Sequence, residues 1–509
     1  MPNLLRVLFF FIAFSACGQP IVYVTQHGAG NTSGTSWTNA LPGTLLAGKV
    51  ATASSETQFW IAAGTYYPTT TTDRSASFSI ASGVSVYGGF QGTESALNER
   101  INDSVKTILS GDIGIPNDRS DNSRNVVQLI NSTQANSIDN LTIRDGSDGD
   151  EGSGLRISFT GTSTSVLVSM CRFIDNKISP SLNGGGALII RSNAGATCNI
   201  TIQECTFSGN QAGFGGAINF YTVGGSIDAR INRSTFDSNA GIQGGAISSR
   251  YLEQSPLNSV QISQSSFSGN TVSNTGGAID IGVVTTQIDR CSFTANLAIR
   301  GGGAIEGSGA VATYTNCLFA RNSAAKGGAV YSLSVDQRTS QFFQNCDFTE
   351  NSATVGGAFY NLMLDESITF AHSLNTNQTT LKNCIVWNNT APDSPTFKNQ
   401  SIRLSVGAEI QNYFFVDFSD VQDLTELWGR GIGNIDTDPR FADAANGNFS
   451  LQASSPAINA GDPNTVNLPA FDLAGRVRIQ NGRVDMGAYE FDCGPGPTAC
   501  PPFSAYRIR

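Results

Sequence analysis

Two acidic side chains, Asp280 and Glu306, are the first candidates for chemistry in this sequence. Each stands two positions after the alanine of a Gly-Gly-Ala motif, so stacking of the two motifs would make them neighbours about 5 Å apart at the backbone. Two like charges at that separation repel by about 3 kcal/mol at an effective dielectric constant of about 20. Such a pair would share a proton or bind a cation. Its spacing also matches the two carboxylates of a retaining glycoside hydrolase, which makes it a candidate catalytic pair.

Tyr331 and Tyr360 occupy the same position in the next two copies of the motif. Because side chains alternate along a strand, this column should point outward if the apolar residue before it points inward. The four residues would then form a ligand-binding surface, with the tyrosines as a platform for sugar rings. The alternative is an ordinary solvated face.

A second candidate site is an acidic loop that contains Asp145, Asp148, Asp150 and Glu151. Carboxylate oxygens are the ligands that calcium prefers, although their order here does not match an EF-hand. The loop is therefore either a calcium site or a plain solvated turn, and calcium is the one cofactor that the sequence suggests.

The elements that must position these residues follow from an internal repeat. Gly-Gly-Ala recurs seven times, and each copy follows a Phe-x-x-Asn motif, with a degenerate eighth copy at Val386 and Asn389. The alanines are Ala187, Ala217, Ala246, Ala278, Ala304, Ala329 and Ala358, spaced by 25 to 32 residues. Short alternating stretches between such turns are too small to pack alone, so we expect parallel stacking into a β-solenoid with asparagine ladders at its turns.

One column of the repeat, two residues before each phenylalanine, is rich in cysteine. It reads Cys171, Cys205, Ser234, Ser265, Cys291, Cys317, Cys346 and Cys384. The column is either a stack of disulfides or metal ligands, or a row of small buried side chains lining the bore. Regular repetition along the solenoid favours the second interpretation, and the absence of a Cys-x-x-Cys pair gives a zinc site no support.

Composition agrees with a β-rich extracellular protein. The 509 residues include 55 glycines and only 14% charged residues, and the net charge is −10. An acidic chain with few lysines lacks the basic face of a nucleic-acid binder, and 30 phenylalanines argue against disorder.

The chain divides into five predicted segments. Residues 1–18 read as a secretory signal peptide, and Cys17 would carry a lipid if the weak lipobox there is used. Residues 19–56 form an N-terminal strand and capping helix, and 57–409 the solenoid, with clear repeats over about 171–390. Residues 410–492 are expected to close the other end as an irregular cap, before a Pro/Gly-rich tail at 493–509. No other run is long and apolar enough to suggest a transmembrane span.

The repeats resemble the polymorphic outer membrane protein repeat of chlamydial surface proteins. The flanks resemble the choice-of-anchor Q domain group of bacterial secreted proteins, on stretches that include Trp60–Tyr66, Val86–Glu94, Asp438–Phe441, Ser455–Asp462 and Val484–Phe491. The resemblance implies a right-handed parallel β-helix, secreted or on the exterior of a bacterial outer membrane. It implies no catalytic motif.

Three functions remain open. The first is adhesion or extracellular glycan binding through the solenoid face, by a protein that is expected to be a monomer and to contact glycans or a neighbouring cell surface. The second is a polysaccharide lyase or glycoside hydrolase, although the sequence has only two histidines, His27 and His372, to serve as a base. The third is a structural spacer for an anchor domain.

Overall fold

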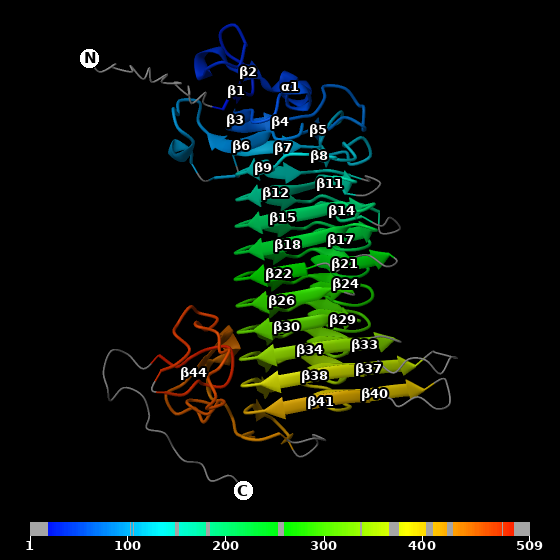
Figure 1. Ribbon diagram of the computed structural model, residues 1–509, viewed down its shortest axis with the longest axis vertical. Coiled ribbons are helices and arrows are strands. Elements are labelled where there is room, and N and C mark those ends of the chain that lie inside the picture. The colour runs from blue at the N-terminus through cyan, green and yellow to red at the C-terminus, as the bar shows by residue number, and fades with distance from the viewer. Residues whose placement is uncertain are drawn as a thin grey trace, which may run out of the picture.

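The computed structural model describes residues 19–492, except for residues 102, 105, 148–151, 180–183, 253–258, 283, 336–337, 366–375, 404–410, 425–430 and 481. Its strands stack as successive coils along one long axis (Figure 1). The chain forms a right-handed parallel β-helix, which confirms the predicted fold class. Each regular coil contributes one strand to each of three long parallel sheets, here called sheets A, B and C.

Sheet A has 14 strands. In spatial order they are β2 (Leu41–Pro42), β1 (Ile21–Thr25), β3 (Gln58–Ala62), β6 (Ser85–Phe90), β9 (Asn136–Asp139), β12 (Ser163–Ser169), β15 (Thr197–Gln203), β18 (Ser226–Asn232), β22 (Ser259–Ser263), β26 (Thr285–Asp289), β30 (Val311–Thr315), β34 (Arg338–Gln344), β38 (Thr376–Lys382) and β41 (Gln411–Asp417).

Sheet B has 12 short strands. They are β4 (Gly64–Tyr66), β7 (Thr107–Ser110), β10 (Thr142–Arg144), β13 (Arg172–Ile174), β16 (Thr206–Ser208), β19 (Thr235–Asp237), β23 (Ser266–Ser268), β27 (Ser292–Thr294), β31 (Leu318–Ala320), β35 (Asp347–Thr349), β39 (Ile385–Trp387) and β42 (Asp420–Val421).

Sheet C has 11 strands. They are β5 (Phe78–Ser79), β8 (Val127–Ile130), β11 (Leu155–Thr160), β14 (Leu188–Asn193), β17 (Ile218–Val223), β21 (Ile247–Leu252), β25 (Ile279–Ile281), β29 (Ile305–Ser308), β33 (Val330–Val335), β37 (Phe359–Asp365) and β40 (Phe397–Arg403). A small sheet D joins β20 (Ala240–Gly241), β24 (Thr271–Val272), β28 (Leu297–Ala298), β32 (Ser323–Lys326) and β36 (Ser352–Val355) between sheets B and C.

The repeated phenylalanines form a continuous stack inside the bore. From Phe173 to Phe348, seven rings lie parallel with neighbouring centroids 4.6–4.9 Å apart, which is the distance between adjacent strands. Each ring is fully buried. The one-per-coil phenylalanine therefore supplies a large apolar side chain at the same level of every coil.

The predicted asparagine ladder is confirmed, and it lies beside the phenylalanine stack. The Nδ2 group of Asn270 donates to Oδ1 of Asn296 at 2.9 Å and to the carbonyl of Phe236 at 3.1 Å. Its own Oδ1 accepts from the side chain and the backbone N–H of Asn239 at 3.0 Å. The pattern continues from Asn176 to Asn389, so each buried amide satisfies its neighbours.

The cysteine column is a row of small buried side chains. All six of its cysteines, and Cys198 as well, are buried and unpaired in the described part of the chain. Their thiols donate to nearby carbonyls, as in the contact of 3.1 Å from Cys317 to the carbonyl of Thr315. Burial raises the pKa of the Cys291 thiol to about 12, so this thiol stays protonated and unreactive.

The N-terminal segment covers the first coil, as predicted. Helix α1 (Leu46–Thr52) packs Leu46 and Val50 into the main core. Two short 3₁₀ helices, η1 (Trp37–Asn39) and η2 (Gly43–Leu45), precede it, and η3 (Leu97–Glu99) lies in a later loop. In the described residues, no helix is long and apolar enough to cross a membrane.

The C-terminal segment, residues 436–492, lies on the flank of the last coils rather than across the end (Figure 1). The expected boundary at residue 410 falls before a further coil, because β41 and β42 still extend sheets A and B. The segment contains β43 (Phe441–Asp443), η5 (Ala444–Asn446) and β44 (Asn448–Leu451).

Corner asparagines between sheets A and B hold this segment. Asn316, Asn345 and Asn383 have positive φ angles near 50°, a backbone conformation that asparagine tolerates. Asn316 accepts from the buried guanidinium of Arg478 at 2.9 Å, and the side chain of Asn345 donates to the carbonyl of Asp485 at 3.2 Å. The corner residues of these coils therefore serve as the docking contacts.

Candidate functional site

The predicted register of the acidic pair is confirmed. Asp280 on β25 pairs directly with Glu306 on β29, and Tyr331 on β33 and Tyr360 on β37 continue the column. Hydrogen bonds between neighbouring Gly-Gly-Ala corners fix this register, because the N–H of each alanine donates to the carbonyl of the alanine in the next coil.

The expectation that this column faces the solvent is wrong. Asp280, Glu306, Tyr331 and Tyr360 are only 8%, 4%, 8% and 1% exposed. The chain that leads into each Gly-Gly corner lies over the column. A Cβ atom on Gly301 would come within 3.0 Å of the Tyr331 ring, and the Lys326 ammonium lies 5.0 Å from the centroid of the Tyr360 ring. The tyrosines are therefore covered by their own coils, and a sugar ring has no open face to stack on.

The side chains of Asp280 and Glu306 are in hydrogen-bonding contact, and a proton held between them would relieve the repulsion of two adjacent carboxylates. Burial, together with the nearby Asp280 carboxylate, raises the pKa of Glu306 well above its usual range. Thr275 Oγ1 also lies 3.5 Å from Asp280 Oδ2. A retaining hydrolase must place a glycosidic bond between its two carboxylates, and this direct contact leaves no room for one.

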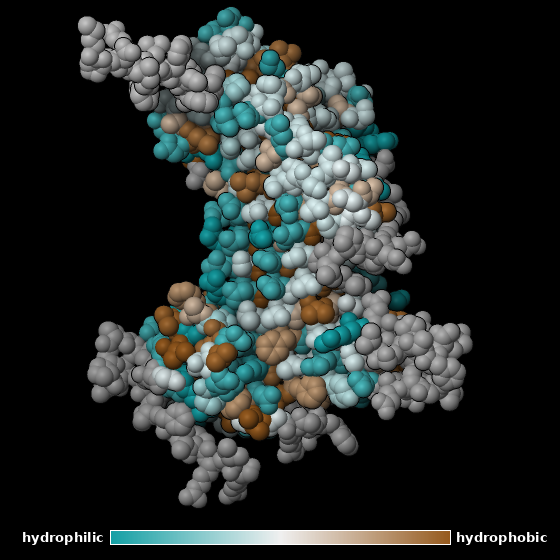
Figure 2. All heavy atoms as spheres, viewed as in Figure 1, coloured by the Kyte–Doolittle hydropathy of each residue, from teal (hydrophilic) through white to brown (hydrophobic). Residues whose placement is uncertain are grey.

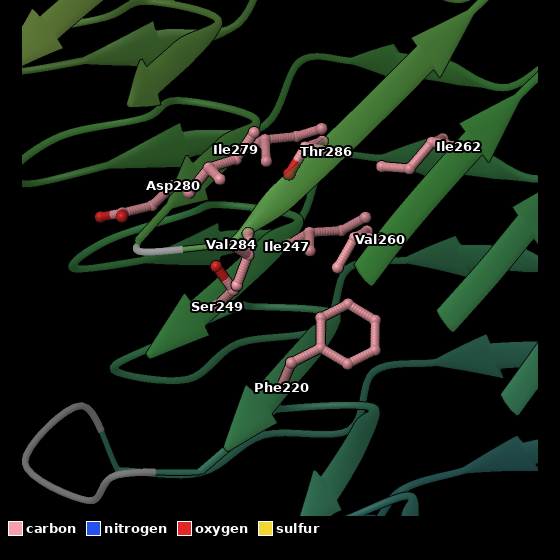
Figure 3. Close-up of a pocket in the computed structure, with 10 residues that line it drawn as sticks. Phe220, Ile247, Ser249, Val260, Ile262, Ile279, Asp280, Val284 and Thr286 are labelled. Carbon is pink, nitrogen blue, oxygen red and sulfur yellow. The ribbon is translucent and has the colours of Figure 1, made fainter. Parts of the chain in front are cut away.

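A small cavity lies next to the acidic pair, inside the bore. It has a volume of about 10 Å³, and its lining is mostly apolar, with Ile247, Ile262 and Ile279 among the residues. Figure 3 shows the Asp280 carboxylate pointing away from these side chains. A cavity of this size and polarity has room for one water molecule at most and stays dry, so it is a packing defect rather than a substrate site.

Of the four acidic residues in the predicted calcium loop, the structure describes Asp145. Asp145 pairs with Arg144 at 2.9 Å and accepts from Ser110 at 3.2 Å, while burial raises its pKa. Asp148, Asp150 and Glu151 lie outside the described residues, and so do Cys17 and His372. Among the residues that the structure covers, no three histidine, cysteine, aspartate or glutamate side chains are grouped as metal ligands would be. The calcium site remains a prediction.

An open groove lies elsewhere, on the outer face of sheet A. It has a volume of about 340 Å³ and crosses β9, β12, β15 and β18. Its polar lining on the outer face includes Ser165, Asn199, Thr201, Asp228 and Arg230. Figure 2 shows hydrophilic residues gathered over this part of the sheet. The guanidinium of Arg230 lies 3.3 Å from the Asp228 carboxylate, with 60% and 34% of the two side chains exposed.

Sequence reasoning missed this groove. Its residues occupy outward positions that carry no repeated motif. The three strands β12, β15 and β18 have only their inward, apolar positions in common. The strict alternation of these strands was the available signal, because it assigns Ser165, Asn199 and Asp228 to one outward column.

The comparisons with known proteins concern the repeat and the overall shape. The family model of the Chlamydia polymorphic membrane protein repeat matches residues 204–221 and 264–282. Both stretches run from a phenylalanine motif through a Gly-Gly-Ala corner, which confirms the predicted resemblance of the repeats. No curated protein matches the chain. The resemblance of the flanks to the choice-of-anchor group remains a prediction.

Two solved structures superpose on this chain with low similarity. Pectate lyase Pel9A has 12% identity and a TM-score of 0.38 over 93% of this chain and 96% of its own. A mannuronic acid specific polysaccharide family 6 lyase from human gut microbiota has 9% identity and a TM-score of 0.37 over 75% of this chain and 91% of its own. TM-scores this low carry no argument about the chemistry of this protein.

Proposed function

We propose that this protein is a secreted or cell-surface binding protein that holds extracellular glycans on the outer face of sheet A. The groove across β9, β12, β15 and β18 carries the proposal, because it combines an open volume of about 340 Å³ with side chains that suit sugar hydroxyls. A flat parallel sheet also repeats its outward positions at every coil, which suits contact with a polymer.

The chemistry of the groove is that of hydroxyl recognition. The Asp228 carboxylate is an acceptor, the Arg230 guanidinium is a donor, and the Asn199 amide is both. Because Asp228 and Arg230 are exposed, their ion pair is worth little, and neighbouring hydroxyls of a sugar can bridge the two groups at small cost. Ser165 and Thr201 leave room for a ring above the sheet.

The repeats support a location outside the cell, since the matching family model describes membrane proteins of Chlamydia. Residues 1–18 add the predicted secretion signal. Adhesion to a neighbouring surface would follow from the same binding, as glycans coat most cells. Hydrolysis by Asp280 and Glu306 has no support, because the pair is buried and internally hydrogen-bonded.

Affinity electrophoresis of the full chain through gels that contain neutral or acidic polysaccharides tests the proposal. Retention should be lost in Asn199→Ala and Arg230→Ala. Arg233→Ala is the matched control, because it removes another exposed arginine at the corner beside the same sheet. Equal mobility with and without every polysaccharide would refute glycan binding and favour the spacer. Release of unsaturated products or new reducing ends would instead make the protein an enzyme.

A further inference from the structure

An exposed pair of aromatic rings lies on the same face as the groove, on the last strand of sheet A. Tyr413 and Phe415, on β41, are 42% and 40% exposed. Their ring centroids are 5.6 Å apart and their planes differ by 30°, so the two rings form one nearly continuous surface. Gln378 and Thr380 on the neighbouring strand β38 border this surface with an amide and a hydroxyl.

The aromatic pair and the groove belong to the same two columns of outward side chains, here called the outer track. One column starts at Asp228 and ends at Tyr413, and the other starts at Arg230 and ends at Phe415. The first runs Asp228, Ser259, Thr285, Val311, Ser340, Gln378, Tyr413, and the second runs Arg230, Gln261, Gln287, Thr313, Phe342, Thr380, Phe415. Every one of these side chains is partly or fully exposed, so the outer track is open from end to end.

The outer track carries no charge between its two ends. From Ser259 and Gln261 through Gln378 and Thr380 its side chains are hydroxyls, amides, one valine and one phenylalanine. At the groove end, the single guanidinium is paired with Asp228. With a net charge of −10 on the whole chain, nothing here attracts a polyanion.

We propose that the ligand is a linear, uncharged polysaccharide that lies along the outer track, with one part in the groove and another stacked on Tyr413 and Phe415. This inference rests on the proposed glycan binding. Six strand-to-strand steps separate β18 from β41, which is about 29 Å at ~4.8 Å a step. An oligosaccharide must therefore extend over about 29 Å to contact both ends.

The two ends contribute differently to recognition. The groove supplies hydrogen bonds to hydroxyls, and the aromatic pair supplies flat apolar surface for the C–H face of a pyranose ring. Simultaneous contact makes the second interaction intramolecular, so affinity should rise steeply once an oligosaccharide is long enough to reach both ends.

The test is isothermal titration calorimetry of the full chain with cello-, xylo- and manno-oligosaccharides from disaccharide to decasaccharide. Affinity for the responding series should rise at least about tenfold between short and long members. The double variant Tyr413→Ala/Phe415→Ala should lose that rise and keep the affinity for short members. Tyr67→Ala/Phe471→Ala is the matched control, because it removes two aromatic rings that are 41% and 45% exposed away from the outer track.

Three outcomes would overturn the inference. Unchanged affinity of the aromatic double variant for long chains, with loss in Arg230→Ala, would refute the outer track and leave glycan binding in the groove intact. Tighter binding of oligogalacturonates than of neutral chains would refute the uncharged ligand. Absence of binding to every neutral and acidic oligosaccharide would refute the proposed function together with the inference.

Discussion

Replacing Glu306 with glutamine should change how the stability of the protein depends on pH. The Glu306 pKa is raised in the folded state by burial and by Asp280, so the folded protein retains a proton that the unfolded chain releases near the usual glutamate pKa. The stability linked to this proton is fully present below the unfolded pKa and is lost as the pH rises through the folded pKa.

The size of the effect follows from the stacking distance. Asp280 and Glu306 are paired on neighbouring strands, whose backbones lie about 5 Å apart, and two unit charges at that separation repel by about 3 kcal/mol at an effective dielectric constant of about 20. Glu306→Gln removes the repulsion, while its amide can still donate a hydrogen bond to Asp280. We therefore expect the variant to become more stable than the wild type by up to about 3 kcal/mol as the pH rises from the usual glutamate pKa through the raised pKa of Glu306.

Urea unfolding at a series of pH values measures this difference. Other buried carboxyls titrate in the same range, so the informative quantity is the free energy of unfolding of the variant minus that of the wild type. Glu204→Gln, which removes a carboxylate from an exposed ion pair with Arg233, is the control and should show little pH dependence. A difference for Glu306→Gln that stays constant with pH would refute the shared proton.

Three further predictions concern the core and the flank. Asn270→Ala should lower the free energy of unfolding by about 3–5 kcal/mol, because it breaks hydrogen bonds to two neighbouring coils. Asn389→Ala, at the end of the ladder, should lower it by less. Equal losses in the two variants would contradict a continuous ladder. Ile279→Asp should abolish the cooperative melting transition by burying a charge in the bore, and an unchanged melting temperature would refute the inward orientation of this column. Burial raises the pKa of Asp347 to about 7 and that of Glu490 to about 8, so the docked C-terminal segment is more stable while these carboxyls are protonated. After correction for intrinsic exchange, its amide hydrogens should therefore exchange more slowly at about pH 5 than at about pH 9. Slower exchange at the higher pH would contradict the raised pKa values of these buried acids.

The repeat determined the fold and the register without any tertiary information. Gly-Gly-Ala and Phe-x-x-Asn recur in fixed order, and strand alternation with parallel stacking then places equivalent residues in columns. The phenylalanine stack, the asparagine ladder and the pairing of Asp280 with Glu306 all follow from this. The two interpretations of the cysteine column differed only in what its side chains touch, and the structure supports the buried row.

Only the tertiary structure decided what covers each column and which outward face stays open. Alternation separates inward from outward, but an outward side chain can still be buried when the coil's own chain folds back over it, as happens to Tyr331 and Tyr360 beneath the Gly-Gly corners. The position of the C-terminal segment on the flank also depends on tertiary contacts, because its hydrogen bonds with Asn316, Asn345 and Asn383 join residues more than 70 positions apart in the sequence. The groove and the aromatic pair on sheet A carry no motif, since solvent-facing positions are free to vary while the packing of the bore fixes the inward ones.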